Sequence, residues 1–347
     1  MIERRQIREI HIIFAYIACV EVNRMANCRM KCNQYMLRKI SLAIVCASIT
    51  IVSLGGCQAD ITSFAATTSN SAPFSFNKLK EATLITVLEV PVGAGIGELS
   101  YGDIGDNRVA ASGPSDFAVA ANGDIYILDN YHGNGDDRIS VFSHGKWERN
   151  IDYSDHVSYG INLTIFDDSL YVFDHNYDQG DAYIIQMTFD GTLLQKYVYN
   201  QEDAPVDVWR LFVIDDQVVV AAYNSCYELD ESAEKAIKSD MLVGDTFEDT
   251  NHRKVTFGQS SWIVPIETLS ILPTPIGQTG KNELFVAYGG NEYICKCDVN
   301  GEPLSIVKLD NLLKETVYIR SSFYVAADGT LYIMVGHQDA LRVYKVL

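Results

Sequence analysis

Short apolar segments alternate with polar turns over most of the chain. From residue 84 to residue 347, runs of Val, Ile, Leu, Phe and Tyr end at Asn-Gly, Asp-Gly or Asp-Asp pairs. β-Branched and aromatic residues favour strands, and these dipeptides suit the left-handed positions of tight hairpins. Segments with a helical period are nearly absent, and residues 231–240 are the one modest helix candidate. The pattern predicts an all-β domain.

The order of apolar and polar segments repeats along the chain. One unit contains Phe117–Gly123, Asp124–Asp129 and Asp137–Phe142, and the same pattern returns at Leu163, Leu211, Leu284 and Phe323. Units of four strands at intervals of about 45 residues are typical of a β-propeller. The segment from Leu84 to Leu347 has room for six such blades, so we predict six four-stranded blades.

Two places depart from the repeat. Residues 232–282 do not follow it, and within them residues 253–264 resemble a lone hairpin, so five blades plus an insertion is the alternative. The last repeat stops after its third strand, whereas residues 84–90 form a strand without a repeat of its own. We expect this N-terminal strand 84–90 to close the ring as the outer strand of the last blade, because closure covers two exposed edges.

The first unit resembles a known repeat. The run Pro114-Ser-Asp-Phe117, followed by Gly123-Asp-Ile-Tyr-Ile-Leu-Asp129 and Arg138-Ile139, resembles the NHL-type repeats of bacterial six-bladed propellers. In NHL repeats the Asp after the second strand and the Arg that opens the third organise the loop between them, and the resemblance implies this role for Asp129 and Arg138. The next unit keeps Asp174 but has Ala182 instead of Arg. Propellers have many unrelated functions, so the resemblance implies no activity.

A basic and then apolar segment precedes the propeller. Met36-Leu-Arg-Lys39 is followed by the apolar run 40–54 and by Leu54-Gly-Gly-Cys57. This order describes a secretory signal, and Leu54–Cys57 resembles the bacterial lipobox, whose cysteine is lipidated. A transmembrane anchor is the alternative, but a span needs about 20 apolar residues and this run is shorter. We predict a lipoprotein signal peptide at residues 36–57, with Cys57 lipidated.

The remaining N-terminal residues complete the predicted organisation. Residues 1–35 fit no signal pattern, and a start codon placed too far upstream explains them most simply. Residues 58–79 are rich in Ser, Thr and Ala and predict a flexible tether between the lipid and a propeller domain of residues 80–347. We expect an exported protein, lipid-anchored to the outer face of the bacterial cytoplasmic membrane, or to the outer membrane of a Gram-negative cell.

The formal charge limits the classes of ligand and partner that the chain can bind. The chain has 45 acidic and 27 basic side chains, and without residues 1–57, which carry eight basic and three acidic ones, the formal charge falls from -18 to -23. Nucleic acid and anionic lipid would be repelled, which leaves a protein, peptide or glycan ligand, with membrane contact through the lipid anchor only.

Only Cys226, Cys295 and Cys297 follow Cys57, so we expect no disulfide framework and a buried Cys295–Cys297 pair.

Carboxylates and histidines concentrate in the loops that join second to third strands and successive blades, which share one face of a propeller. The candidate binding face consists of Asp129, His132, Asp136, Asp137, His156, Asp174, His175, Asp178, Asp181 and His337. Candidate ligands for Ca²⁺ or Zn²⁺ are His132, His156, His175, Asp178 and Asp181. The alternative is that these residues fill exposed turns, which Asp, Asn, His and Gly tolerate. No other cofactor is expected.

A glycine-rich loop, four tyrosines and three tryptophans are better explained by structure than by ligand binding. Gly93-Ala-Gly95-Ile-Gly97 precedes Glu98 and a turn rather than a helix, so it does not predict a nucleotide site. Tyr126, Tyr171, Tyr332 and Tyr344 alternate with apolar residues and predict core positions. We expect Trp147, Trp209 and Trp262 to pack between blades, with stacking on a carbohydrate as the alternative.

The sequence as a whole predicts a binding or interaction module. It combines an expected lipid anchor, a rigid propeller with diverse polar loops, and no recognisable nucleophile constellation. The alternative is a metal-dependent hydrolase or lactonase-like enzyme whose metal, at the mouth of the channel, activates water or polarises a carbonyl.

Overall fold

The computed structural model describes the C-terminal part of the chain with several gaps. The described residues are 74–93, 95–99, 114–129, 138–157, 160–176, 181–199, 208–222, 225–249, 251–267, 272–288, 293–309, 312, 318–337 and 339–347. The predicted signal peptide, Cys57 and most of the tether lie outside them. Within these ranges, no helix has the length and apolar content needed to cross a membrane.

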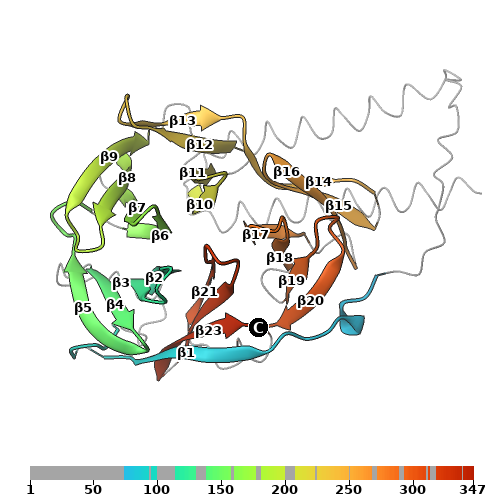
Figure 1. The fold of residues 1–347 in the computed structure, drawn as a ribbon, viewed down its shortest axis with the longest axis horizontal. Helices are drawn as coiled ribbons and strands as arrows, with labels where there is room; N and C mark the ends of the chain where they lie inside the picture. Colours follow the sequence, from blue (N-terminus) through green and yellow to red (C-terminus); the bar gives the residue numbers. More distant parts are fainter. Residues whose placement is uncertain are drawn as a thin grey trace, which may run out of the picture. The chain divides into compact units, whose positions relative to one another are not determined.

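The described strands form antiparallel sheets around a common centre (Figure 1). The first sheet contains β2 (Pro114–Val119), β3 (Ile125–Asp129), β4 (Arg138–Ser143) and β5 (Lys146–Asp152). The next contains β6 (Gly160–Phe166), β7 (Ser169–Asn176), β8 (Asp181–Thr188) and β9 (Leu193–Tyr199). It is followed by β10 (Val208–Ile214), β11 (Gln217–Ala222), β12 (Ser225–Asp230) and β13 (Lys235–Ser239). A parallel bridge between Lys235 of β13 and Val198 of β9 joins the outer strands of these last two sheets.

The C-terminal half adds three more sheets. One has three strands, β14 (Leu242–Phe247), β15 (His252–Gly258) and β16 (Ser260–Pro265). The next contains β17 (Thr274–Gln278), β18 (Leu284–Tyr288), β19 (Tyr293–Cys297) and β20 (Pro303–Lys308). The last contains β21 (Tyr318–Val325), β22 (Leu331–Gly336), β23 (Ala340–Val346) and β1 (Leu84–Pro91). The protein is therefore a β-propeller, as predicted.

The sheet β14–β16 departs from the predicted four-stranded blade. The innermost strands β21, β2, β6 and β10 contact one another in turn, and β17 contacts β21. Between β10 and β17 the β14–β16 sheet instead contacts β12 and β17. Among the described residues it has three strands, and it lies in the region 232–282 where the sequence repeat is weakest. The count of six blades stays a prediction.

Ring closure by the N-terminal strand is confirmed. β1 pairs antiparallel with β23, from Leu84 opposite Val346 to Pro91 opposite Ala340. Leu88 and Val90 point into the core and are almost completely buried. Strand β1 therefore covers the free edge of β23, and the first and last parts of the domain share one sheet.

The predicted tether extends too far toward the propeller. Phe74, Phe76 and Leu79, assigned to it by composition, pack against the core. The 3-10 turn η1 (Phe76–Lys78) places the Phe76 ring 4.8 Å from that of Tyr288. Further along, the Ala82 N–H donates to the Ile306 carbonyl over 2.8 Å. Two phenylalanines in a Ser- and Ala-rich segment carry enough apolar surface to anchor it. Residues 74–91, here called the N-terminal strap, join β20 to β23.

Residues 231–240, the modest helix candidate, do not form a helix. The Asp230 carboxylate accepts hydrogen bonds from the N–H groups of Ser232 and Ala233, which makes a turn, and Lys235–Ser239 then pairs with β12 as strand β13. Strand pairing with a neighbouring edge outweighs the weak helical propensity of this polar segment.

The buried positions agree with most of the expected core. Cys226, Cys295 and Cys297 are free thiols with no exposed surface, and burial raises the pKa of the Cys295 thiol to about 12. The four predicted core tyrosines are buried, and so is Trp262. Trp147 is 37% exposed on strand β5, so the prediction that it packs between blades is wrong. The side chain of Trp209 lies outside the described residues.

Candidate functional site

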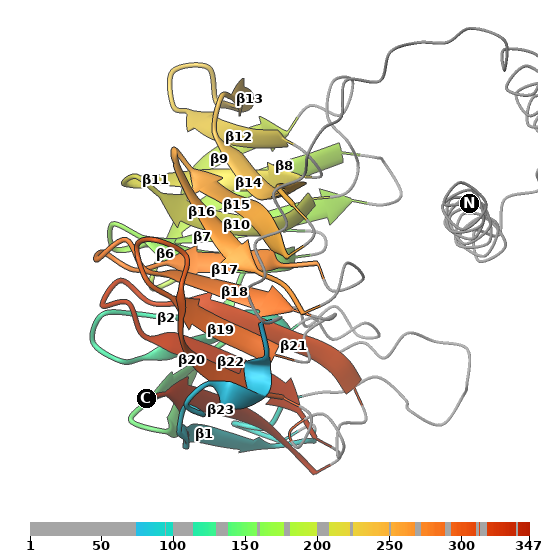
Figure 2. The same cartoon turned by 90° about the vertical axis from the view of Figure 1, so that its right-hand side faces the viewer.

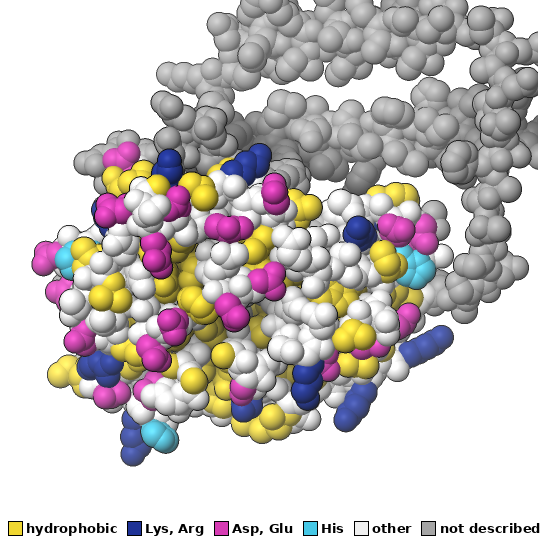
Figure 3. Space-filling model, turned by 45° about the horizontal axis from the view of Figure 1, so that its top comes forward, with side chains coloured by type: hydrophobic (Ala, Val, Ile, Leu, Met, Phe, Trp, Pro, Cys, Tyr) yellow, Lys and Arg dark blue, Asp and Glu magenta, His cyan; other side chains and the backbone are white. Residues whose placement is uncertain are grey.

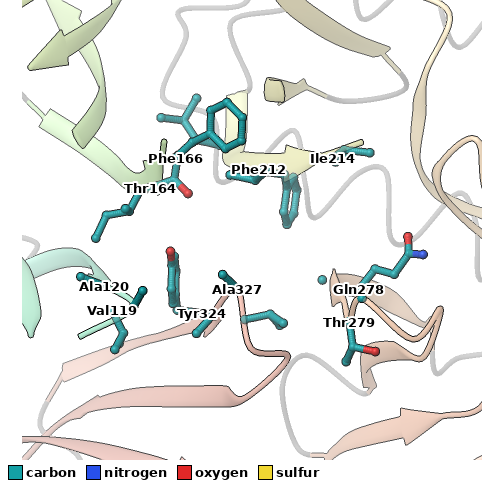
Figure 4. A pocket seen from close by; sticks show the side chains of 18 of the residues that line it. Val119, Ala120, Thr164, Phe166, Phe212, Ile214, Gln278, Thr279, Tyr324 and Ala327 are labelled. Carbon is teal, nitrogen blue, oxygen red and sulfur yellow. The ribbon is translucent and has the colours of Figure 1, made fainter. Parts of the chain in front are cut away.

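A cavity of about 870 Å³ opens at the centre of the ring. Its wall is formed by the hairpins that join first to second strands in five sheets, β2–β3, β6–β7, β10–β11, β17–β18 and β21–β22. Side chains of these hairpins surround the opening (Figure 4). In the side view the hairpins lie at one face of the sheets (Figure 2).

The turns at the mouth need left-handed backbone conformations. Asp167 and Asp168 have φ of 46° and 59°, and Asp215 and Asp216 have φ of 49° and 60°. The β2–β3 turn uses Gly123 instead, at φ 90°. Two consecutive positive φ values define the hairpin turn that follows the twist of the strands. The Asp-Asp pairs therefore form the turns that the sequence predicts, and they place two carboxylates at each of two neighbouring hairpins.

The wall of the cavity combines aromatic and aliphatic side chains with polar ones. The ring of Tyr126 stacks on that of Phe189 with centroids 5.2 Å apart, and Phe212 meets Phe257 edge-on at 5.1 Å. Figure 4 shows Phe166 and Phe212 on one side of the open centre and Tyr324 on the other. Aromatic walls of this kind bind apolar or aromatic groups through area and ring geometry.

A buried carboxylate lies below the wall. Asp116 on β2 is 1% exposed, and its Oδ2 accepts the Leu163 N–H of β6 over 3.0 Å. Its Oδ1 accepts the hydroxyl of Ser322 on β21 and lies 3.7 Å from Nη2 of Arg210 on β10. One side chain therefore ties together the innermost strands of four sheets.

Tyr324 places a phenol beside this carboxylate. Burial raises its pKa to about 12, and hydrogen bonds with the Ile165 backbone and the Thr164 side chain partly offset that effect. The phenol is therefore a neutral hydrogen-bonding group at physiological pH. Together with Arg210, which also lines the cavity, it gives the apolar hollow polar groups in its depth.

The rim of the cavity is acidic. Asp167, Asp168, Asp215 and Asp216 are exposed and line the mouth. Arg210 is the cation among the described lining residues, and Asp116 balances its charge. On this face, Asp and Glu side chains surround an apolar hollow (Figure 3). The arrangement disfavours anions and attracts cations.

The face predicted from the sequence lies at the opposite ends of the strands. Asp129 ends β3 and Asp174 lies near the end of β7, away from the hairpins that line the cavity. Asp129 is buried, and its Oδ2 accepts the Arg138 Nε–H over 3.1 Å. Arg138 also donates to the Glu98 carbonyl. The pair joins the end of β3 to the start of β4, and the loop-organising role that the NHL resemblance implies for it stays a prediction.

The other residues of the predicted binding face differ in their exposure, and some of them lie outside the described residues. Asp174 and His175 are buried, and so is His337, whose Nε2 lies 3.2 Å from the Tyr344 hydroxyl oxygen. Asp181 is exposed and His156 half-buried. Four residues of the set lie outside the described ones, His132, Asp136, Asp137 and Asp178.

A metal site on that face stays a prediction. Among the described residues, no group of three or more His, Cys, Asp and Glu side chains is arranged to hold a metal ion. Of the five candidate ligands, His132 and Asp178 lie outside the described residues. The hydrolase or lactonase alternative, which depends on this metal, also stays a prediction.

The glycine-rich loop binds a carboxylate of its own. The Gly95 N–H donates to Glu98 Oε2 over 2.7 Å, and a Cβ on Gly93 would overlap the same carboxylate. The space that a phosphate would occupy in such a loop is therefore filled by Glu98, which agrees with the sequence prediction.

Asp116, Arg210 and Tyr324 do not belong to the binding face predicted from the sequence. The available signal was a charged residue within an otherwise apolar innermost strand, at Asp116 of β2 and Arg210 of β10. A charge is rarely buried without a partner, so two such residues on different innermost strands could have been paired with each other.

No protein-family model and no curated protein matches the sequence. Solved structures with a similar fold include a DUF4221-family member from Bacteroides vulgatus, with 11% identity over 78% of this chain and 99% of that one and a TM-score of 0.46. Catalytically inactive virginiamycin B lyase from Staphylococcus aureus with quinupristin has 14% identity over 77% and 100%, with a TM-score of 0.43. YCF48 bound to a peptide has 10% identity over 78% and 97%, with a TM-score of 0.41. These β-propellers resemble the chain in fold alone.

Proposed function

We propose that the chain is an extracytoplasmic, lipid-anchored β-propeller that acts as a binding module, with its ligand in the central cavity. The observation that carries this proposal is the cavity of about 870 Å³, which is lined by aromatic, aliphatic and polar side chains. Ligand pockets occupy about 300–1,000 Å³ and combine an apolar lining with a few polar groups. The cavity has such a volume, and its lining contains both apolar and polar side chains.

The anchor follows from the sequence. Leu54–Cys57 has the lipobox pattern, and acyl chains on Cys57 would hold the domain at a membrane surface. Cys57→Ser should move the protein from the membrane fraction to the soluble exported fraction. Persistent membrane association of this variant would contradict lipidation at Cys57.

Site-specific cross-linking in the producing cells tests the location of binding. A photoreactive phenylalanine analogue at Gln278, which lines the cavity, should give cross-linked products with the membrane-tethered full chain. The same analogue at Ser232, an exposed residue of the β12–β13 turn that is not part of the lining, is the matched control. Equal products at both positions, or none at Gln278, would overturn the cavity as the binding site.

A further inference from the structure

We propose that the cavity receives a large apolar side chain from a basic peptide segment, whose flanking Lys or Arg residues pair with the carboxylates of the rim. This inference rests on the proposed function and names the chemistry of its ligand. It follows from three observations: the apolar side chains in the wall of the cavity, the carboxylates at its mouth, and the Arg210–Asp116 pair whose charges balance below them.

The hollow selects the central side chain. The partly buried rings of Phe166 and Phe189 and the exposed side chain of Val213 offer apolar surface in its wall. The rings of Tyr126, Phe212 and Phe257 lie behind this surface and are almost completely buried. Burial of a Phe or Leu side chain contributes about 1.5–3 kcal/mol, so one inserted apolar residue provides an anchor. Interfaces commonly place such an anchor in a central pocket with polar residues around it.

The carboxylates at the mouth favour basic residues on either side of the apolar residue of the peptide. The two Asp-Asp turns bring four carboxylates to the rim, Asp167, Asp168, Asp215 and Asp216. Arg210 does not neutralise them, because Asp116 already balances its charge. An acidic segment would meet this rim with like charge, whereas Lys and Arg would approach it favourably.

The other hairpins of the ring leave the rim acidic. Asp124 accepts a hydrogen bond from the Asn122 amide, and Glu283 pairs with Lys296 over 2.8 Å. Lys281 adds one ammonium group at the β17–β18 turn, and Asp328 adds one carboxylate at the β21–β22 turn. The charge at the mouth therefore stays negative.

Exposed ion pairs are individually weak. Each contributes about 0.2–1 kcal/mol and is screened by salt. The rim should therefore favour basic flanks by about tenfold through several pairs together, and this preference should fall as the ionic strength rises. The apolar anchor should not depend on salt in this way.

Binding to defined peptide pools tests the inference. The probes are fluorescent pentapeptides with a central Phe and flanks of Lys and Arg, of Ser and Gln, or of Asp and Glu, measured by anisotropy with the purified full-length chain in detergent. We expect the basic pool to bind about tenfold more tightly than the Ser and Gln pool, and a central Gly to abolish binding. Equal binding of basic and uncharged pools, or no binding of the basic pool, would overturn the inference.

A rim variant separates charge from folding. Asp167→Asn with Asp168→Gly, combined with Asp215→Asn and Asp216→Gly, removes four charges and supplies the Asn-Gly pair that these turns prefer. The matched control removes four exposed charges away from the cavity, with Glu231→Gln, Glu234→Gln, Asp240→Asn and Glu248→Gln. We expect the rim variant to lose at least tenfold in affinity for the basic pool and the control less than threefold. Equal losses would contradict a role of the rim.

Two further outcomes distinguish this inference from the proposed function. If the Gln278 cross-links persist in the rim variant and the basic pool does not bind, the binding module stands and the basic peptide is wrong. If phenethylammonium alone binds as tightly as the basic pool, the ligand is a small organic cation and the peptide inference fails. If no cross-link forms at Gln278 and no pool binds, both proposals fail.

Discussion

The Arg210 guanidinium lies 3.7 Å from the Asp116 carboxylate, although the two side chains come from the innermost strands of different sheets. Arg210 is 14% exposed and Asp116 2% exposed in their side chains. Asp116 also accepts hydrogen bonds from Leu163 and Ser322, so it holds four innermost strands at one point. A charge pair at this depth is costly to break, because removal of one member leaves the other buried without its partner.

The first prediction concerns this pair. Asp116→Leu should lower the free energy of unfolding by about 3 kcal/mol, because Arg210 loses its counterion and the Leu163 N–H loses its acceptor. Urea unfolding measures the change.

A double substitution provides the control. Asp116→Leu with Arg210→Met removes both charges and should recover at least 1 kcal/mol relative to Asp116→Leu alone, since an apolar pair of similar size needs no counterion. If the double variant is as unstable as the sum of the single ones, the two charges do not interact and the interpretation is wrong.

The second prediction concerns the turns at the mouth. Asp167→Asn with Asp168→Gly should raise the free energy of unfolding by about 0.5–1 kcal/mol, because both positions have positive φ and Gly adopts it without strain. Gly123→Ala provides the opposite case. Its Cβ would meet no atom within 4 Å, but φ is 90°, so strain alone should destabilise the domain by about 1 kcal/mol. Stabilisation by Gly123→Ala would contradict the argument.

Local sequence patterns predicted much of the fold. Closure by β1 followed from an unmatched strand at 84–90 and a last repeat with three strands, and the register from Leu84 with Val346 confirms it. Burial of Cys295 and Cys297 followed from their spacing on one apolar strand. The first inference uses the repeat itself and the second uses neighbouring residues, and a single sequence contains both kinds of pattern.

The site depended on contacts that no local pattern contains. Ser322 and Asp116 form a hydrogen bond across 206 positions. The mouth combines turns from five hairpins, and each turn alone resembles an ordinary solvent-exposed turn. In the sequence, histidines and carboxylates concentrate in the longer loops, and several of these residues lie outside the described ones. The predicted binding face is therefore the one opposite the mouth of the cavity.

The third prediction concerns the N-terminal strap. The Phe76 ring is 2% exposed and lies between the rings of Tyr288 and Tyr293, at 4.8 and 5.4 Å. Phe76→Ala should lower the free energy of unfolding by about 3 kcal/mol and open the strap to proteases. Limited proteolysis followed by mass spectrometry locates the cut.

Phe74 is the matched control for the strap. Its ring packs edge-on against Phe76 at 5.0 Å, but the side chain is only partly buried, so Phe74→Ala should cost about 1 kcal/mol. If both variants are cleaved at the wild-type rate, the strap does not depend on Phe76.

The last prediction concerns alkaline pH. Burial raises the pKa of the Cys226 thiol from 9.0 to about 11 and that of Cys295 to about 12, so both stay protonated in the folded state when the unfolded chain ionises. This contribution is complete below pH 9 and is lost as the pH rises toward 11–12, at about 1.4 kcal/mol per pH unit for each thiol. Urea unfolding at pH 8, 9.5 and 10.5 should show the fall. Cys226→Ala should cost about 1 kcal/mol at pH 8 and give a smaller slope; an unchanged slope would exclude Cys226 as a source.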